Sequence, residues 1–216
     1  MTLRILLADD QESVRVGFRL ILDSQPDMDV VGEASDGQQA LELAAELRPD
    51  VVLADIRMPR LDGLELTRRL AGPGVENPLR VVVVTTFGLD EYVHTALGNG
   101  ACGFLLKRSG PTLLVEAVRA AMAGDTLISP SLTVGLLRHH REAGRPRAAQ
   151  PLDALTVRET EIARLVARGM TNAELGAALF ISAGTAKTHV SNIQRKLAVR
   201  NRVGIAAWVW GNGLEE

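Results

Sequence analysis

The chain has 216 residues with 24 basic and 26 acidic side chains, a formal net charge of −2, and 46% hydrophobic residues. This length suits one large domain or two small ones, and no apolar run approaches the roughly 18 residues that a membrane-spanning helix requires. The amino-terminal segment MTLRILLADD has neither the basic start nor the long apolar stretch of a signal peptide, so we expect a cytoplasmic protein without a membrane partner. The single cysteine, Cys102, cannot form an internal disulfide, and we interpret it as a small packed side chain.

The charges are unevenly distributed along the chain. Residues 1–125 carry 12 basic and 19 acidic side chains, residues 126–150 carry 4 and 1, and residues 151–216 carry 8 and 6. The stretch LRHHREAGRPRAAQP, residues 137–151, is rich in Arg, Ala and Pro and loses apolar periodicity. We therefore predict a first domain over 1–125, a linker with a short helix over 126–150, and a second domain over 151–216.

The first domain alternates strand and helix patterns. Apolar, β-branched runs predict strands at residues 3–8, 30–34, 51–55, 80–85 and 103–106, and helical patterns lie between or after them at 12–24, 37–47, 63–71, 90–99 and 111–123. This alternation predicts an α/β fold with a doubly wound, five-stranded parallel sheet covered by helices on both faces. No GxGxxG motif follows the first strand; the acidic pair Asp9-Asp10 stands there instead, which argues against a dinucleotide site.

Carboxylates end two of the predicted strands. Asp9 and Asp10 follow the first strand and Asp55 ends the third, and in this fold the carboxyl ends of the strands face one crevice. Two unit charges ~4 Å apart repel by about 1 kcal/mol in water and about 4 kcal/mol at an effective dielectric constant near 20. Three converging carboxylates therefore require a cation, and an all-oxygen site suits Mg²⁺. The alternative is that these acids only cap helices or solvate strand ends.

Two further side chains are predicted at the same edge. Thr85 ends the fourth strand and Lys107 follows the fifth. A hydroxyl and an ammonium beside a metal-bound carboxylate are what a phosphoryl group on Asp55 would require. The chain has 21 arginines and only three lysines, so a lysine at this position indicates a site that needs a compact point charge, although chance could also place it there.

The segments LLADDQESVR, VVLADIRMPRLDG, VVVVTTF and GFLLKRS resemble the receiver domain of two-component response regulators, in order and over nearly all of residues 3–123. The resemblance implies that a sensor histidine kinase phosphorylates Asp55. It also implies a set of supporting residues: Asp9, Asp10, Asp55 and the Arg57 carbonyl as Mg²⁺ ligands, Thr85 as the switch hydroxyl, Phe104 as the switch aromatic residue, and Lys107 as the phosphate contact. Gly88-Leu89 follow the TTF segment where family members often carry acids, and we expect a looser loop there.

The sequence of the second domain predicts helices only. Thr156 with Glu159 and Thr171 with Glu174 form two capping-box patterns, and Ser182 can cap a third helix. We predict helices at 156–168, 171–179, 183–197 and 201–210, of which the second and third form a helix-turn-helix.

The third of these helices has two distinct faces. At about 100° per residue, one face is apolar, with Ala186, Val190, Ile193 and Leu197. The opposite face is small, polar and cationic, with Gly184, Thr188, Ser191 and Arg195 flanked by Lys187 and Asn192, and residues 175–214 contain no acid. Such a face can enter a DNA major groove, although an ordinary solvated face is the simpler alternative.

The segment from Leu155 to Ala207 resembles the LuxR-type DNA-binding domain of NarL/FixJ-family regulators. The resemblance implies that Lys187, Thr188 and Ser191 read bases, and that Thr185, Arg195 and Lys196 contact phosphates. It also implies that the last helix pairs two domains, for which Val203, Ala207 and Trp210 are the candidates. The alternative is that both tryptophans belong to the core.

Together these features predict a phosphorylation-switched transcriptional regulator that is not a metabolic enzyme, with a histidine kinase, double-stranded DNA and a second copy of itself as partners. Two alternatives remain open. A phosphohydrolase with an aspartyl nucleophile typically needs a second acid two residues later, where this chain has Arg57. A constitutive DNA-binding protein would use the first domain only for interactions.

Overall fold

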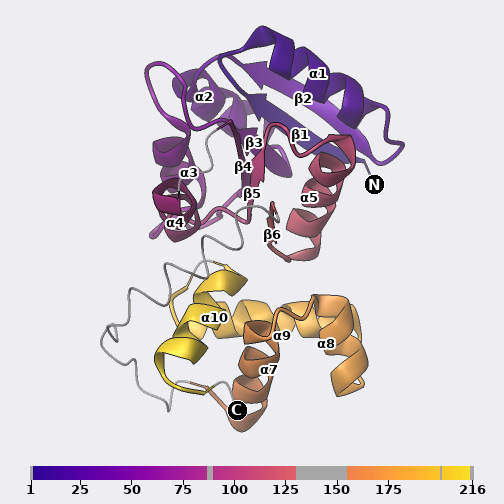
Figure 1. Cartoon of the computed structure of the whole chain (residues 1–216), viewed down its shortest axis with the longest axis vertical. Helices are drawn as coiled ribbons and strands as arrows, with labels where there is room; N and C mark the ends of the chain where they lie inside the picture. The colour runs from indigo at the N-terminus through magenta and orange to yellow at the C-terminus, as the bar shows by residue number, and fades with distance from the viewer. Residues whose placement is uncertain (1, 87–89, 130–154, 200, 215–216) are drawn as a thin grey trace.

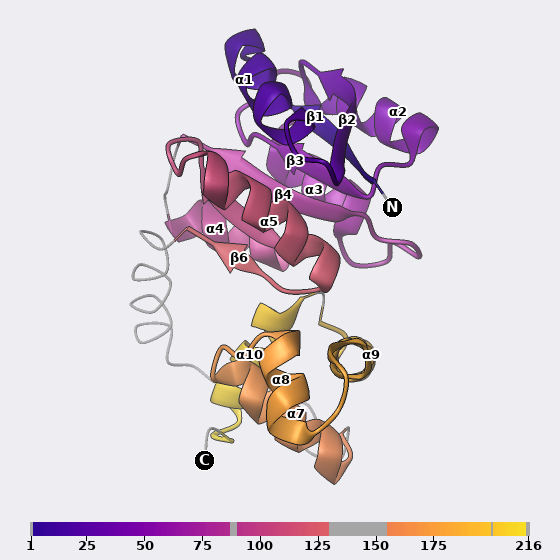
Figure 2. The same ribbon diagram turned by 90° about the vertical axis from the view of Figure 1, so that its right-hand side faces the viewer.

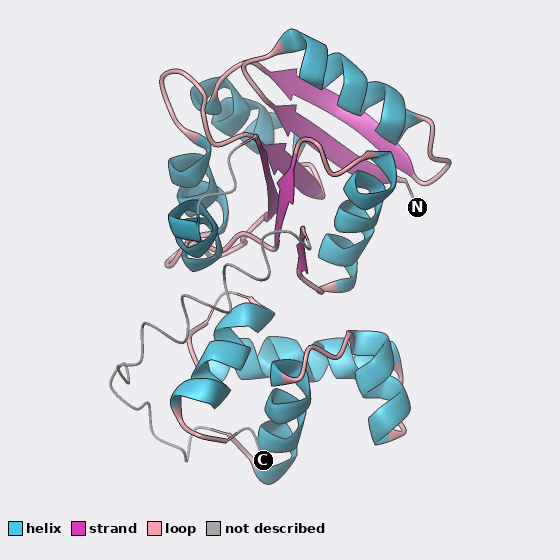
Figure 3. Ribbon diagram, viewed as in Figure 1, coloured by secondary structure: helices cyan, strands magenta, loops and turns pink. Residues whose placement is uncertain are grey.

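The computed structural model describes residues 2–86, 90–129, 155–199 and 201–214 (Figure 1). Most of the segment for which we predicted a linker helix, and the Gly88-Leu89 pair, lie outside these residues. Among these residues, the strands gather in one domain and the other is built from helices alone, as Figure 3 shows by colour. Among the described residues, no helix combines the length and the apolar character needed to cross a bilayer.

The first domain is built on a parallel sheet with strand order β2-β1-β3-β4-β5-β6. The strands are β1 (Leu3–Ala8), β2 (Met28–Ala34), β3 (Val51–Ala54), β4 (Arg80–Thr85), β5 (Gly103–Leu106) and β6 (Leu127–Ile128). The fold class and five strands match the prediction, but the sheet has six strands. β6 has only two residues, too few for a recognisable strand pattern, and it pairs with β5 through Gly103–Leu127 and Phe104–Ile128. It extends the sheet into residues predicted to begin the linker.

Helices cover both faces of this sheet: α1 (Glu12–Asp23), α2 (Gly37–Leu47), α3 (Gly63–Ala71), α4 (Asp90–Gly98) and α5 (Pro111–Ala123). Successive strand residues alternate between faces. Ile5 packs with Leu22 of α1 and Leu114 of α5, whereas its neighbour Leu6 packs with Ala40 of α2 and Leu66 of α3. The α1–α5 layer and the α2–α3 layer therefore sandwich the sheet (Figure 2).

The second domain contains α7 (Val157–Ala167), α8 (Asn172–Leu179), α9 (Ala183–Lys196) and α10 (Arg202–Gly211). Both predicted capping boxes are formed, at Thr156–Glu159 and Thr171–Glu174, and Ser182 caps α9. The predicted apolar face of α9 is buried in the core of this domain, as its residues show: Ala186, Val190, Ile193 and, just past the helix end, Leu197.

Candidate functional site

The predicted acidic residues converge at the carboxyl ends of β1 and β3. Asp9 and Asp55 are buried, Asp10 is exposed, and one carboxylate oxygen from each lies within 4.8 Å of the others. The ladder continues into both buried acids, because the backbone N–H of Asp9 donates to Ala34 and that of Asp55 donates to Ala8. Three hard oxygen donors at this spacing fit Mg²⁺, which prefers carboxylate oxygens and retains waters.

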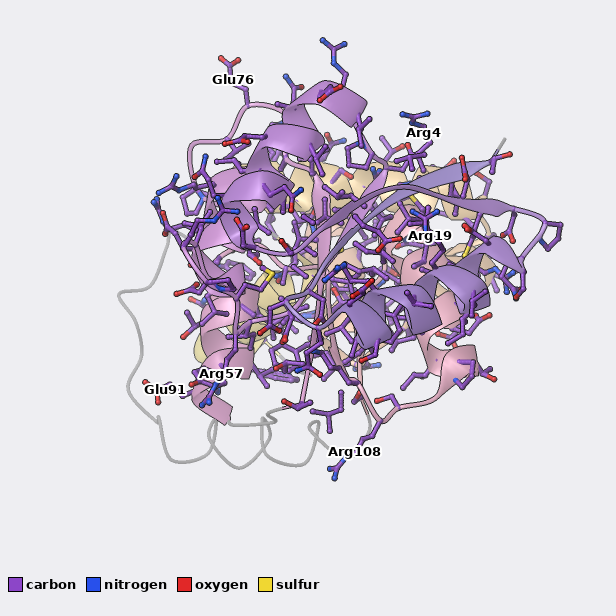
Figure 4. All side chains as sticks on the ribbon, turned by 90° about the horizontal axis from the view of Figure 1, so that it is seen from above. Arg4, Arg19, Arg57, Glu76, Glu91 and Arg108 are labelled. Atoms are coloured by element: carbon purple, nitrogen blue, oxygen red, sulfur yellow. The ribbon has the colours of Figure 1, made fainter. Side chains whose placement is uncertain are left out.

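Lys107 lies between the two buried acids. Its Nζ is 2.7 Å from Asp9 Oδ2 and 2.8 Å from Asp55 Oδ2, and its side chain is only 8% exposed. The next residue, Arg108, is exposed and points away from the domain (Figure 4). The turn after β5 therefore presents one cation to the acids and the other to solvent.

The protonation equilibria of this group reflect burial and pairing together. Burial raises the pKa of Asp9, against the opposing effect of hydrogen bonds from Lys107 and from the Gln11 N–H. Burial by itself would lower the pKa of Lys107, but hydrogen bonds to Asp55 and Asp9 outweigh it, and the pKa is raised. Lys107 is therefore a cation at neutral pH, and it partly offsets the repulsion between the carboxylates.

The two predicted switch residues flank the Lys107 turn. Thr85 is fully buried at the end of β4, and its carbonyl accepts a 2.9 Å hydrogen bond from the Lys107 N–H. Phe104 is fully buried in β5 and packs with Val93, Ala96 and other residues of α4 and its surroundings. The hydroxyl-bearing strand end, the lysine and the aromatic residue thus belong to adjacent strands.

The loop after β3 folds back onto the phosphoacceptor candidate. A Cβ atom at Gly63 would lie 1.9 Å from the Asp55 carbonyl oxygen, so only glycine allows this approach. The Gly63 N–H donates to the Ile56 carbonyl at 2.9 Å, which closes the loop. Arg57, whose carbonyl was predicted as a metal ligand, lies within this loop and has an exposed side chain.

The polar face of α9 is largely open. Five of the six predicted DNA contacts are exposed, namely Thr185, Thr188, Ser191, Arg195 and Lys196. Lys196 also pairs with Glu159 within the domain, with 2.6 Å between Nζ and Oε2. Lys187 is half-buried, and its Nζ donates to the carbonyl of Met122 at 2.8 Å. Met122 belongs to α5 of the first domain, so one predicted base reader contacts the other domain.

Comparison with known proteins agrees with both halves of this description. The response regulator receiver domain model matches residues 5–119, and the model described as bacterial regulatory proteins, luxR family, matches residues 153–209. The chain belongs to the NarL/FixJ family of two-component response regulators.

Similar proteins extend over its whole length. The transcriptional regulatory protein LiaR of Bacillus subtilis is 40% identical over 98% of this chain and 99% of its own. The nitrate/nitrite response regulator NarL of Escherichia coli K12 is 38% identical over 95% and 94%. The crystal structure of ChrA, from a heme-sensing two-component system, aligns over 99% of this chain and 98% of its own with 37% identity and a TM-score of 0.53. This response regulator is therefore a transcriptional regulator and not a metabolic enzyme.

In this response regulator, the carboxyl-terminal end of α5 is covered by the DNA-binding domain. The last carbonyls of a helix have no partner within the helix, and the last turn of α5 carries no basic residue that could bond to them. Lys187 bonds the carbonyl of Met122, and Asn172 Nδ2 donates to that of Ala123 at 2.9 Å. The Lys187 ammonium also compensates the negative end of the α5 dipole.

Two residues at the start of α10 complete the contact between the domains. Asn201 caps α10 through its Oδ1, while its Nδ2 donates to the carbonyls of Leu97 and Ala101 at 2.9 and 3.0 Å. Arg202 is buried, pairs with Asp125 and donates to the carbonyl of Met170. Burial lowers the pKa of Arg202, and Asp125 opposes this shift.

The predicted dimer contacts on α10 have different surroundings. Val203 is half-buried against the apolar cluster of the first domain that contains Ile56 and Phe104. Ala207 is half-buried, and Trp210 is 38% exposed. Trp208, by contrast, belongs to the core of the second domain. The two tryptophans are therefore not equivalent, and the alternative in which both are core holds for Trp208 alone.

Sequence reasoning missed the residues that join the domains. Asp125, Asn172, Asn201 and Arg202 were considered only as charges or helix-start positions, if at all. A charged residue in an otherwise apolar helix suggests a buried pairing, and Arg202 is the one charged residue of α10, RVGIAAWVWG. Its partner Asp125 could not be identified, because the pairing depends on how two separate domains meet.

Proposed function

We propose that this regulator is switched by phosphorylation of Asp55, and that the switch releases its DNA-binding domain to bind a two-fold DNA site as a dimer in the cytoplasm. The observation that carries the proposal is the position of Lys107, shared between Asp9 and Asp55 in a chain that also carries the polar face of α9. A phosphoryl group on Asp55 would offer Lys107 new acceptor oxygens.

The phosphoryl donor is the phosphohistidine of a sensor kinase, as membership of the family supports. An Asp55 carboxylate oxygen attacks phosphorus, a P–O bond forms as the P–N bond breaks, and the electron pair leaves with the histidine nitrogen. Asp9, Asp10, Asp55 and the Arg57 carbonyl would hold Mg²⁺, which would neutralise charge on the transferred oxygens. The Lys107 ammonium places a positive charge beside the acceptor carboxylate of Asp55. The Thr85 hydroxyl is the candidate hydrogen-bond donor to a phosphoryl oxygen.

The contact between the domains supports a closed, unphosphorylated form. Lys187 bonds to Met122 and is unavailable to a base edge while it does so. Val203 packs on the first domain and is unavailable to a second copy through the same surface. DNA contact and pairing through Val203, Ala207 and Trp210 therefore both compete with the closed arrangement.

The face of α9 supports the DNA-binding role. Thr188 and Ser191 are short and exposed and would read bases with Lys187, while Thr185, Arg195 and Lys196 would contact phosphates. Lys196 would then contact a DNA phosphate in place of Glu159 or together with it.

The test begins with the full chain, acetyl phosphate and Mg²⁺. We expect one phosphoryl group by intact-mass spectrometry, and none on the Asp55→Asn variant, which keeps the shape but loses the nucleophilic oxygen. The phosphorylated chain is then used to recover fragments of genomic DNA. Recovery that requires phosphorylation supports the proposal. Equal recovery by the Asp55→Asn variant would instead indicate a constitutive DNA-binding protein.

A further inference from the structure

We propose that Ser129 is a positioning residue that connects the turn carrying Lys107 to the chain leading to the DNA-binding domain. The proposal rests on the proposed function and adds a component that neither the resemblance nor the comparisons assign. Ser129 directly follows β6 and is only 1% exposed. It is one of the few buried polar residues outside the phosphoacceptor site and the contact between the domains.

The Ser129 hydroxyl joins both ends of the Lys107 turn. Its oxygen accepts a 3.1 Å hydrogen bond from the N–H of Leu106, the residue before Lys107. It also lies 2.8 Å from the hydroxyl oxygen of Ser109, two residues after Lys107. The turn is closed by its own hydrogen bond, from the Ser109 N–H to the Leu106 carbonyl at 2.8 Å. One buried side chain therefore supports the turn at its start and at its end.

The Ser129 backbone is attached to the same strand. Its N–H donates to the carbonyl of Phe104 at 2.9 Å, which continues the β5–β6 pairing. On the opposite side of β5, the Lys107 N–H donates to the carbonyl of Thr85 at 2.9 Å. The turn is thus held between Thr85 on β4 and Ser129 after β6, and a shift of Thr85 or Lys107 changes the position of Ser129.

Ser129 lies at the point where the chain leaves the first domain. Residues after Ser129 lead to the second domain, and Asp125, just before β6, pairs with Arg202 of α10. The short segment from Asp125 to Ser129 therefore contacts the DNA-binding domain at one end and the Lys107 turn at the other. Ser129 transmits the phosphorylation-dependent position of the turn to that segment.

Removing the hydroxyl tests this role. In Ser129→Ala the buried Leu106 N–H loses its acceptor, and the Ser109 hydroxyl loses its partner. We expect the rate and extent of phosphorylation by acetyl phosphate to stay within about twofold of the parent, because Asp9, Asp10, Asp55 and Lys107 are unchanged. The ratio of DNA affinities with and without phosphorylation should fall at least fivefold. A conservative Ser129→Thr variant, which keeps the hydroxyl, should restore most of the ratio.

Two further variants keep the test decisive. Ser24→Ala makes the same substitution at an exposed serine after α1, whose hydroxyl donates to the carbonyl of Ile21 and accepts from the side chain of its neighbour Gln25, and should leave the ratio unchanged. Ser109→Ala removes only the hydrogen bond between the two hydroxyls and should lower the ratio by a smaller factor, and it carries the test if Ser129→Ala does not fold.

Three results separate this inference from the proposed function. A parent chain that binds DNA equally with and without phosphorylation contradicts the proposed function itself. A parent that switches, together with Ser129→Ala or Ser109→Ala variants that switch equally well, overturns only the role of Ser129. A Ser129→Ala variant whose phosphorylation rate falls as much as its DNA response also overturns it, because the effect would then be local to Asp55.

Discussion

Lys107 is the residue on which the two halves of the proposed switch depend. It is one of three lysines in a chain that otherwise uses arginine, and the structure places its ammonium 2.7 and 2.8 Å from two buried carboxylate oxygens. A compact ammonium on a flexible stem can follow a phosphoryl group, whereas a planar guanidinium would require a wider space. The rarity of lysine in the sequence therefore pointed to a real structural feature.

Lys107→Arg tests the need for a point charge. We expect Asp55 still to accept phosphate, with a phosphorylated fraction within about twofold of the parent, because the positive charge is retained. The gain in DNA affinity on phosphorylation should fall by about tenfold or more, which corresponds to about 1.4 kcal/mol of lost coupling. Intact-mass spectrometry and a DNA titration on the same sample measure both. Arg108→Lys, at the exposed neighbouring residue, serves as the control, and full activation by Lys107→Arg would show that any cation suffices.

At the scale of single elements, α9 separates side chains by length and direction. Thr188 is short, exposed and central on the polar face, whereas Arg195 lies about two turns further along and is also exposed. On this helix we expect the central Thr188 to reach a base edge and the more distant Arg195 to reach the DNA backbone. The apolar face that orients this helix was predictable from periodicity alone and is buried as expected.

The predicted roles of Thr188 in base recognition and Arg195 in phosphate contact can be measured on the phosphorylated chain. Thr188→Ala should change which bases are preferred and cost about 1–3 kcal/mol at the recovered DNA site. Arg195→Ala should weaken binding to all sequences about equally and reduce the salt slope by roughly one unit. Competition among a set of base-substituted duplexes at several salt concentrations gives both quantities. If Arg195→Ala relaxed base preference while Thr188→Ala did not, the helix would lie in the groove the other way round.

The Glu159 carboxylate, in the first turn of α7, makes a pH-dependent contribution to the stability of the fold. Although burial on its own raises the pKa of Glu159, hydrogen bonds from Lys196 and Thr156 outweigh it and lower the pKa to about 2. A carboxylate with a depressed pKa in the folded state stabilises the fold above its unfolded pKa, near 4.5. This contribution is lost as the pH falls from about 4.5 towards 2.

We expect Glu159→Gln to be less stable than the parent at pH 7, by about 1 kcal/mol, because the variant loses the charge pairing with Lys196 but keeps an acceptor for the cap. The difference should disappear towards pH 2, as measured by urea unfolding across this range. Glu174→Gln, in a matching capping box on α8 without a lysine partner, should show a smaller change. A difference between parent and Glu159→Gln that does not vary with pH would contradict the assigned pairing.

At the scale of the whole molecule, the sequence predicted most elements within each domain but none of the contacts between the domains. The strand ends at Asp9, Asp55, Thr85 and Lys107 were predictable because parallel strands share one carboxyl edge. The two-residue strand β6 was missed because it is too short for a periodic signal. The contacts of Lys187, Asn201 and Arg202 with the first domain depend on docking, which no local pattern encodes.

The ion pair between Arg202 and Asp125 offers a way to open the molecule without phosphate. Asp125→Asn leaves the buried guanidinium without its anion, which is costly while the domains stay together and is relieved when they separate. We expect the unphosphorylated variant to bind DNA at least fivefold more tightly than the unphosphorylated parent. Glu161→Gln, at an exposed acid on α7, is the matched control. Unchanged affinity in Asp125→Asn would show that this pair does not hold the closed form.

The most direct test of the central claim, that phosphorylation of Asp55 frees α9 from the first domain, is amide hydrogen exchange of the full chain with and without acetyl phosphate and Mg²⁺. We predict faster exchange on phosphorylation in the segments that meet between the domains, namely residues 120–128, 170–174 and 184–190, and no such change in Asp55→Asn. The core of α7 serves as the internal reference. Exchange that is unchanged in these segments while mass spectrometry shows Asp55 fully phosphorylated would contradict the account.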